Sequence, residues 1–157
     1  MKLSNTIKLI IAVAIPLAVG AVAGMFTSKA VPGWYATLIR PSFAPPNWLF
    51  GPVWTTLYIL MGISFYLIWK MEPGRDRNRG ITIFAVQLFF NFIWSFIFFY
   101  YKQIGWALAD IIILWVLLVS MLVLFYKLRP LAAFLNIPYL LWVSFASVLN
   151  GAYYVLN

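Results

Sequence analysis

The chain has 157 residues, of which 65% are hydrophobic and only 9% are charged, with a net charge of +8. Soluble domains carry about 25% charged residues, so this composition predicts an integral membrane protein without a soluble catalytic module. The absence of Cys and His excludes disulfides, thiolate nucleophiles, zinc sites and His-ligated haem. The three acids are Glu72, Asp76 and Asp110. The first two fall in a predicted loop, so no carboxylate pair inside the membrane can perform acid–base catalysis.

The basic residues flank the apolar stretches and do not form one face, which argues against nucleic-acid binding. One end of the predicted bundle carries eight of the eleven: Lys2, Lys8, Lys70, Arg75, Arg77, Arg79, Lys127 and Arg129. The other end carries Lys29, Arg40 and Lys102. The positive-inside rule therefore predicts, for an inner-type membrane, a cytoplasmic N-terminus and an external C-terminus.

Five apolar stretches fill most of the chain, and each is long enough to cross the roughly 30 Å hydrocarbon core of a bilayer at 1.5 Å per residue. They predict an all-α, multi-pass membrane protein: one domain over residues 1–157, built as a bundle of five transmembrane helices. The predicted spans are residues 9–26, 48–69, 81–101, 104–126 and 131–156.

The first span has two features that need interpretation. Two lysines before it and the sequence Ala21-Val22-Ala23 are typical of a secretory signal peptide, but the apolar run exceeds the usual 7–15 residues. We therefore expect a retained helix. Gly20 and Gly24 form a G-x-x-x-G pair, which favours close helix packing within the monomer or across a dimer.

The connection between the first two spans, residues 28–47, is unusually long for a compact protein. Its apolar side chains predict a short interfacial helix: Trp34, Tyr35, Leu38, Ile39 and Phe43. Pro41, Pro45 and Pro46 then prevent the helix from continuing. This structured loop is either an aromatic contact with the membrane interface or a lid over a cavity.

Three later spans each carry a stripe of aromatic or amide side chains at helical spacing. In span two the stripe is Phe50, Trp54, Tyr58, Met61 and Phe65; in span three it is Gln87, Asn91, Trp94 and Ser95; in span five it is Tyr139, Trp142, Ala146 and Asn150. Polar groups at this depth need hydrogen-bond partners. We expect the stripes to face inward, serving helix packing or the wall of a ligand cavity, with at least one of the two amides bonded between helices.

Two further features belong to spans four and five. Asp110 is an acid inside a span, and it either binds a ligand or is stabilised by the dipole of the nearby helix N-terminus. Pro138 removes a backbone hydrogen bond and predicts a bend in the fifth helix. The small Ala146 between Trp142 and Asn150 leaves a recess, suited to close packing or to a flat ligand.

Several of these residues occur in an arrangement that closely resembles the translocator protein family (TspO/MBR, the peripheral-type benzodiazepine receptor). The resemblance covers essentially the whole chain, and its most specific part runs from the loop into span two. The matching residues are Trp34-Tyr35, Arg40-Pro41-Ser42-Phe43, Pro45-Pro46-Asn47-Trp48, Gly51-Pro52-Val53-Trp54-Thr55-Thr56-Leu57-Tyr58, Met61-Gly62, Gln87-Leu88, Asn91, Trp94, Trp106-Ala107-Leu108, Asp110, Pro138-Tyr139, Trp142, Phe145-Ala146 and Leu149-Asn150.

The resemblance implies a five-helix bundle, often a homodimer, that binds porphyrins such as protoporphyrin IX and synthetic benzodiazepine-site ligands. By position, it implies a role in porphyrin photodegradation for Trp54 and Trp142, and it adds Trp48 to the pocket. Combined with the stripes and the loop, the predicted ligand-binding residues are Trp34, Arg40, Trp48, Phe50, Trp54, Tyr58, Gln87, Asn91, Trp94, Tyr139, Trp142, Ala146 and Asn150. No metal site and no obligatory cofactor are expected.

The sequence differs from the family pattern at the sterol motif. Leu149 and Tyr153 are present, but the basic residue expected after them is replaced by Val155-Leu156-Asn157, and such motifs are weak in any case. We do not expect strong sterol binding.

Three functions are consistent with the sequence. The first is binding of a tetrapyrrole in sensing or regulation, with Arg40 or Lys29 pairing with the propionates. The second is light-dependent porphyrin degradation, in which the porphyrin is the photosensitiser and the protein supplies position. The third is a component of porphyrin transport, although five spans cannot form two equal inverted halves.

Overall fold

The computed structural model describes residues 3–157 and contains, over that range, helices and no strands. Lys2, counted above among the basic residues of the N-terminal end, lies outside this range. The main helices are α1 (Asn5–Ala30), α2 (Phe50–Trp69), α3 (Arg75–Ser95), α4 (Ile104–Leu128), α5 (Pro130–Phe134) and α6 (Ile137–Leu156). Short π or 3₁₀ segments extend three of them: η1 (Val31–Tyr35), η2 (Asn47–Leu49) and η3 (Phe96–Tyr100).

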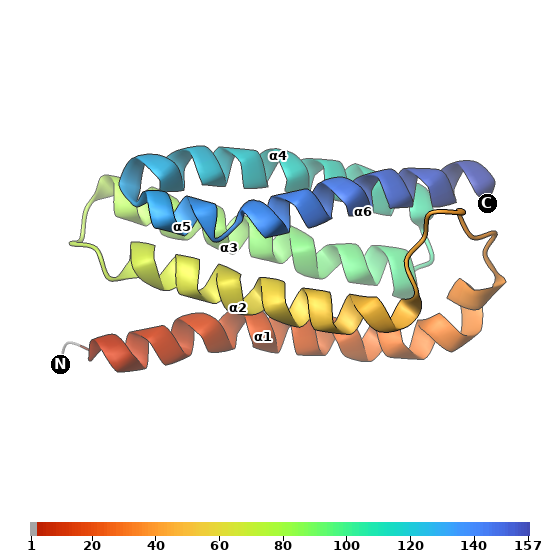
Figure 1. The fold of residues 1–157 in the computed structure, drawn as a ribbon, viewed down its shortest axis with the longest axis horizontal. Helices are drawn as coiled ribbons and strands as arrows, with labels where there is room; N and C mark the ends of the chain where they lie inside the picture. The colour runs from red at the N-terminus through yellow and green to blue at the C-terminus, as the bar shows by residue number, and fades with distance from the viewer. Residues whose placement is uncertain (1–2) are drawn as a thin grey trace.

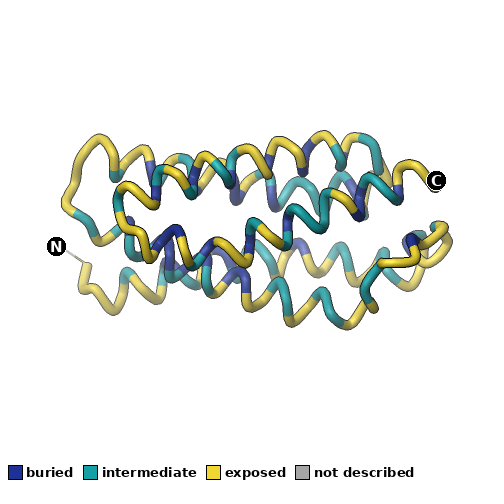
Figure 2. The backbone as a smooth tube through the Cα atoms, turned by 45° about the horizontal axis from the view of Figure 1, so that its top comes forward, coloured by how far each residue is buried: buried dark blue, intermediate teal, exposed yellow. Residues whose placement is uncertain are grey.

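The helices run up and down in one antiparallel bundle, with α5 and α6 together forming the fifth pass (Figure 1). Five helical segments are long and apolar enough to cross a membrane, as predicted. The N-terminus lies at one end, and the C-terminus lies at the other end beside the loop between α1 and α2 (Figure 1). Many large apolar side chains face outward while the buried positions lie inside the bundle (Figure 2), as expected when the surrounding solvent is lipid.

Helices α1 and α2 approach closely at two glycines. A Cβ atom on Gly62 would lie 2.5 Å from the backbone Cα of Val13, and one on Gly20 would lie 2.2 Å from the ring of Tyr58. A Cβ on Gly24 would meet nothing within 4 Å. The two glycines of the G-x-x-x-G pair therefore have different surroundings: Gly20 packs against α2 within the monomer, whereas Gly24 faces outward.

The first helix extends further into the following connection than the sequence predicted. The hydroxyls of Thr27 and Ser28 donate hydrogen bonds to the carbonyls of Ala23 and Met25, each at 3.1 Å, so these polar residues continue the helix instead of ending it. The helix then kinks at Gly33 (φ −102°, ψ −109°). The predicted interfacial helix is thus the end of this kinked segment, and irregular backbone occupies residues 38–46.

The predicted bend at Pro138 is wrong. The fifth pass breaks earlier, at Leu135 and Asn136 between α5 and α6, and Pro138 lies in the first turn of α6. A proline in a first helical turn removes no intrahelical bond, because the first N–H groups have no acceptor there. Span three also begins earlier than predicted, since its arginines form the first turns of α3.

Candidate ligand-binding site

A buried chain of hydrogen bonds joins α2, α3 and α6 in the middle of the bundle. The Tyr58 hydroxyl donates to Asn91 Oδ1 at 2.7 Å, and Asn91 Nδ2 donates to the Tyr139 hydroxyl oxygen at 2.8 Å. Tyr139 donates in turn to Gln87 Oε1 at 3.0 Å, and Gln87 Nε2 donates to the sulfur of Met61 at 3.6 Å. All five side chains are buried. The inward-facing stripes are therefore confirmed, and both amides bond between helices.

Aromatic rings gather next to this network, on the side toward the loop. Trp54 stacks on Tyr58 with ring centroids 5.5 Å apart, and it meets Trp142 edge-on at 6.5 Å. Trp142 also contacts Phe50 of α2 at 5.9 Å and Phe145 of α6 at 5.5 Å. The indoles of Trp54 and Trp142 thus converge from two helices inside the protein. We call Phe50, Trp54, Tyr58, Tyr139, Trp142 and Phe145 the aromatic cluster.

Two polar atoms in this half of the protein are buried without a partner. Trp142 Nε1 is inaccessible and donates to no acceptor, and the same holds for the acceptor Asp110 Oδ2 on α4. Buried polar atoms are normally hydrogen-bonded. The unpartnered indole N–H lies within the aromatic cluster, so an acceptor atom of a ligand would satisfy it.

Other predicted residues connect helices near the loop. Trp94 Nε1 donates to Asn150 Oδ1, and Asn150 Nδ2 donates to the carbonyl of Ile104, both at 3.0 Å. These bonds join α3, α6 and the start of α4. Ala146 is half-buried and packs against the central core. Trp94 and Asn150 therefore serve helix contacts in this structure.

The loop residues are divided between the cluster and the surface. Phe43 packs edge-on against Phe145 at 6.3 Å, and so brings the loop onto the aromatic cluster. Trp34 is half-buried and contacts Phe98 at 5.8 Å. Arg40 is exposed and donates to the carbonyls of Ala44 (3.3 Å) and Pro45, within the loop. Trp48 is 73% exposed, so most of its side chain lies at the surface of the structure.

The loop end is held by contacts that sequence reasoning missed. The Tyr153 hydroxyl donates to the Tyr35 hydroxyl oxygen at 2.7 Å. The side-chain amide of Asn157 pairs with the backbone of Ile39: Ile39 N donates to Asn157 Oδ1 at 2.8 Å, and Asn157 Nδ2 donates to the Ile39 carbonyl at 3.2 Å. Partners 118 residues apart leave no periodic signal in a single sequence, so no pattern could have found them.

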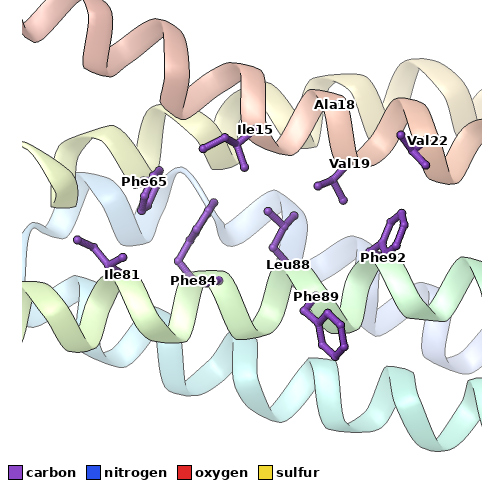
Figure 3. A pocket seen from close by; sticks show the side chains of 11 residues that line it. Ile15, Ala18, Val19, Val22, Phe65, Ile81, Phe84, Leu88, Phe89 and Phe92 are labelled. Carbon is purple, nitrogen blue, oxygen red and sulfur yellow. The ribbon is translucent and has the colours of Figure 1, made fainter. Parts of the chain in front are cut away.

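An apolar groove lies on another face of the molecule. It has a volume of about 510 Å³ and runs between α1 and α3, with Phe65 of α2 at its floor (Figure 3). Its lining is Ile15, Ala18, Val19, Val22, Phe65, Ile81, Phe84, Ala85, Leu88, Phe89 and Phe92. None of the predicted ligand-binding residues is among them. In the aromatic cluster the rings contact one another, so a flat ligand must separate them to bind there.

Comparison with known proteins identifies the family. Residues 12–156 match the model of the TspO/MBR family. The chain belongs to that family. It is 42% identical to the tryptophan-rich protein TspO of Archaeoglobus fulgidus, covering 98% of this chain and 99% of the relative. It is also 42% identical to the human translocator protein over 74% of this chain and 70% of that protein.

A bacterial family member carries a different name. The tryptophan-rich sensory protein of Cereibacter sphaeroides is 33% identical over 74% of this chain and 72% of its own length. Together with the five membrane-spanning helices, these family relations support a sensory or translocator role in a membrane.

Proposed function

We propose that the protein binds a tetrapyrrole, such as protoporphyrin IX, between α2 and α6 beneath the loop, and that benzodiazepine-site ligands use the same place. The observation that carries the proposal is the convergence of Trp54 and Trp142, with ring centroids 6.5 Å apart. Stacking on an aromatic ring contributes about 0.5–1.5 kcal/mol beyond the burial of apolar area. The unpartnered Trp142 N–H supplies a donor in the same place.

The loop is the proposed cover and the source of charge for the ligand. Phe43 contacts Phe145 of the aromatic cluster, so displacement of the loop would uncover the rings. Lys29 and Arg40 are the two basic residues in the connection of residues 28–47. Either side chain can pair with a porphyrin propionate. Arg40 can do so after its guanidinium leaves the carbonyls of Ala44 and Pro45.

Titration with protoporphyrin IX, followed by quenching of tryptophan fluorescence, tests this proposal. Trp54→Phe and Trp142→Phe should each weaken binding about three- to tenfold, because each removes one indole contact. Trp106 is 72% exposed on α4, so Trp106→Phe is the matched control and should leave the affinity unchanged. Ala146→Thr should also weaken binding by narrowing the recess. Equal affinities for all five proteins would disprove the site.

Light-dependent degradation of the bound porphyrin is the second proposed activity. It is supported by the continuous ring contacts from Trp142 through Trp54 to Tyr58, which place oxidisable side chains beside the proposed ligand. Illumination of the complex should give an altered porphyrin absorption spectrum in the wild type, and Trp54→Phe and Trp142→Phe should slow the change. Binding without any light-dependent product in the wild type would exclude this activity.

Transport is the alternative, favoured by the name of the human translocator protein. Proteoliposomes loaded with a porphyrin-binding protein inside should then accumulate protoporphyrin IX faster than protein-free vesicles. Equal rates in both would exclude transport.

The orientation and the homodimer are also proposals. We propose that the N-terminus is cytoplasmic and the C-terminus external. Alkaline phosphatase is active only after export from the cytoplasm, so a fusion after Asn157 should be active. An inactive fusion would contradict the proposed orientation. We further propose that a second copy packs in the groove between α1 and α3. Because the chain lacks cysteine, Phe89→Cys in that groove should form a disulfide-linked dimer. Val148→Cys, which is exposed on α6, should not.

A further inference from the structure

A second groove lies between α3 and α4 and differs chemically from the first. It has a volume of about 540 Å³. Four polar side chains line one part, Arg75, Asn78, Arg79 and Thr82, and three apolar side chains line the other, Ile83, Val86 and Leu117. It begins at the first turn of α3, at the end of the bundle opposite the loop (Figure 1).

The polar part presents two arginines on one helical face. Arg75 and Arg79 are one turn apart, and Asn78 and Thr82 continue the same face of α3. Arg79 makes an exposed ion pair with Asp76 at 3.4 Å, while Arg75 has no ionic partner within residues 3–157. Arg77 is turned elsewhere, since its Nε donates to the Trp69 carbonyl at 3.0 Å. Exposed ion pairs contribute little, so both groove arginines can bind an anion.

The depth of these residues corresponds to the layers of a bilayer. The span from Arg75 to Tyr100 has 26 residues, about 39 Å of helix at 1.5 Å per residue, which exceeds the roughly 30 Å hydrocarbon core. The arginines at its start therefore lie at the membrane–water interface. Val86 lies about 16 Å further along the helix axis, at a depth where acyl chains pack. A cationic mouth above an apolar groove matches the shape and charge of one phospholipid.

We propose that this groove binds one anionic glycerophospholipid, with its phosphate on Arg75 and Arg79 and an acyl chain along Ile83, Val86 and Leu117. Arginine binds phosphate in a bidentate manner, and each basic residue near a membrane surface favours an anionic lipid about fivefold. The charge of the protein argues against a second copy as the occupant, because the chain has three acidic residues and eleven basic ones.

Native mass spectrometry of the purified protein tests the proposal. The protein is mixed with equal amounts of phosphatidylglycerol and phosphatidylcholine that carry the same acyl chains. The wild type should retain phosphatidylglycerol about 25-fold in preference to phosphatidylcholine, since each of the two arginines contributes about fivefold. Arg75→Gln/Arg79→Gln should reduce the ratio to about one. Lys127→Gln/Arg129→Gln, which removes the same charge at the same end but outside the groove, should leave the ratio within twofold of the wild type.

Two further measurements separate a lipid site from a general anion site. Val86→Trp fills the apolar part without changing charge and should reduce phosphatidylglycerol retention about fivefold. Soluble glycerophosphoglycerol, the headgroup without acyl chains, should not displace the lipid. The proposal is overturned by an equal ratio for the two lipids in the wild type, by an equal loss in both charge variants, by normal retention in Val86→Trp, or by displacement with the headgroup alone. Helicity and melting temperature confirm that each variant is folded.

Discussion

The middle of the bundle and its loop end are both held by hydrogen bonds between distant side chains, but in different surroundings. In the middle, Tyr58, Asn91, Tyr139 and Gln87 are bonded to one another and buried. At the loop end, Asn157 bonds to the Ile39 backbone in an exposed position, and Arg40 bonds to loop carbonyls, also exposed. Water can replace the exposed bonds of Asn157 and Arg40, whereas it cannot replace the buried bonds in the middle or the buried bond between Tyr153 and Tyr35.

This difference assigns the two regions different roles. An unsatisfied buried polar group costs about 1–3 kcal/mol, whereas the net contribution of an exposed hydrogen bond is smaller. The middle network should therefore determine stability and hold Tyr58 and Tyr139 in place. The exposed part of the loop around Ile39 and Arg40 should open locally at little cost, as expected for a cover over the aromatic cluster.

The largest expected effect comes from breaking the central network. Asn91→Leu removes the acceptor of Tyr58 and the donor to Tyr139. It should lower the free energy of unfolding by about 2–3 kcal/mol, because the buried Tyr58 hydroxyl loses its acceptor and the buried Tyr139 hydroxyl loses one of its two partners. The measurement is unfolding in mixed micelles with increasing denaturing detergent. In the control Ser120→Ala, the lost bond joins an exposed hydroxyl to the Val116 carbonyl of the same helix, and stability should change little. Similar losses in both variants would contradict the comparison.

A second, smaller effect is expected from Gly20, the glycine by which α1 contacts Tyr58 of the network. In Gly20→Ala the new Cβ would lie 2.2 Å from Tyr58 Cε2, and Tyr58 cannot move without straining its bond to Asn91 and its stacking on Trp54. Overpacking of this kind costs about 1–3 kcal/mol. Gly24→Ala is the matched control, since no atom lies within 4 Å, and it should gain about 0.5–1 kcal/mol from helix propensity. Thermal unfolding of both variants in the same detergent decides the point. Equal shifts would show that Tyr58 is not held by the network.

Residue patterns predicted the main helices and which faces point inward, because both depend on local chemistry. Apolar length identifies a membrane span, and the polar edges of Trp54 and Tyr58 exclude lipid-facing positions. Patterns did not predict the partners. Asn91 bonds to residues 33 and 48 positions away. Helical spacing predicts the face of the helix on which a side chain lies, but it does not identify the residue that packs against it.

The errors in helix boundaries have local physical causes. Thr27 and Ser28 suggested a loop, but their hydroxyls bond to carbonyls of their own helix and so tolerate a helical backbone. Pro138 suggested a bend inside a helix, but the break lies at Leu135 and Asn136. The position of the break depends on tertiary packing. The buried Asn136 lies at the break, and its Nδ2 donates to Ser64 Oγ of α2 at 2.6 Å. That contact leaves no signal in the spacing of span five.

The smallest expected effect on stability belongs to the loop end, and there the comparison is sharpest. Asn157→Ala removes both bonds between the side-chain amide and the Ile39 backbone, yet it should cost less than about 1 kcal/mol of unfolding free energy, because water takes the place of the amide. The local effect should be larger: the Ile39 amide, which donates to Asn157 Oδ1, should exchange its hydrogen several-fold faster. Tyr154→Phe, an exposed neighbour at 57%, should leave that rate unchanged. If exchange at Ile39 does not respond to Asn157→Ala, other contacts close the loop, among them the buried bond between Tyr153 and Tyr35. Tyr35→Phe would then become the variant that opens it.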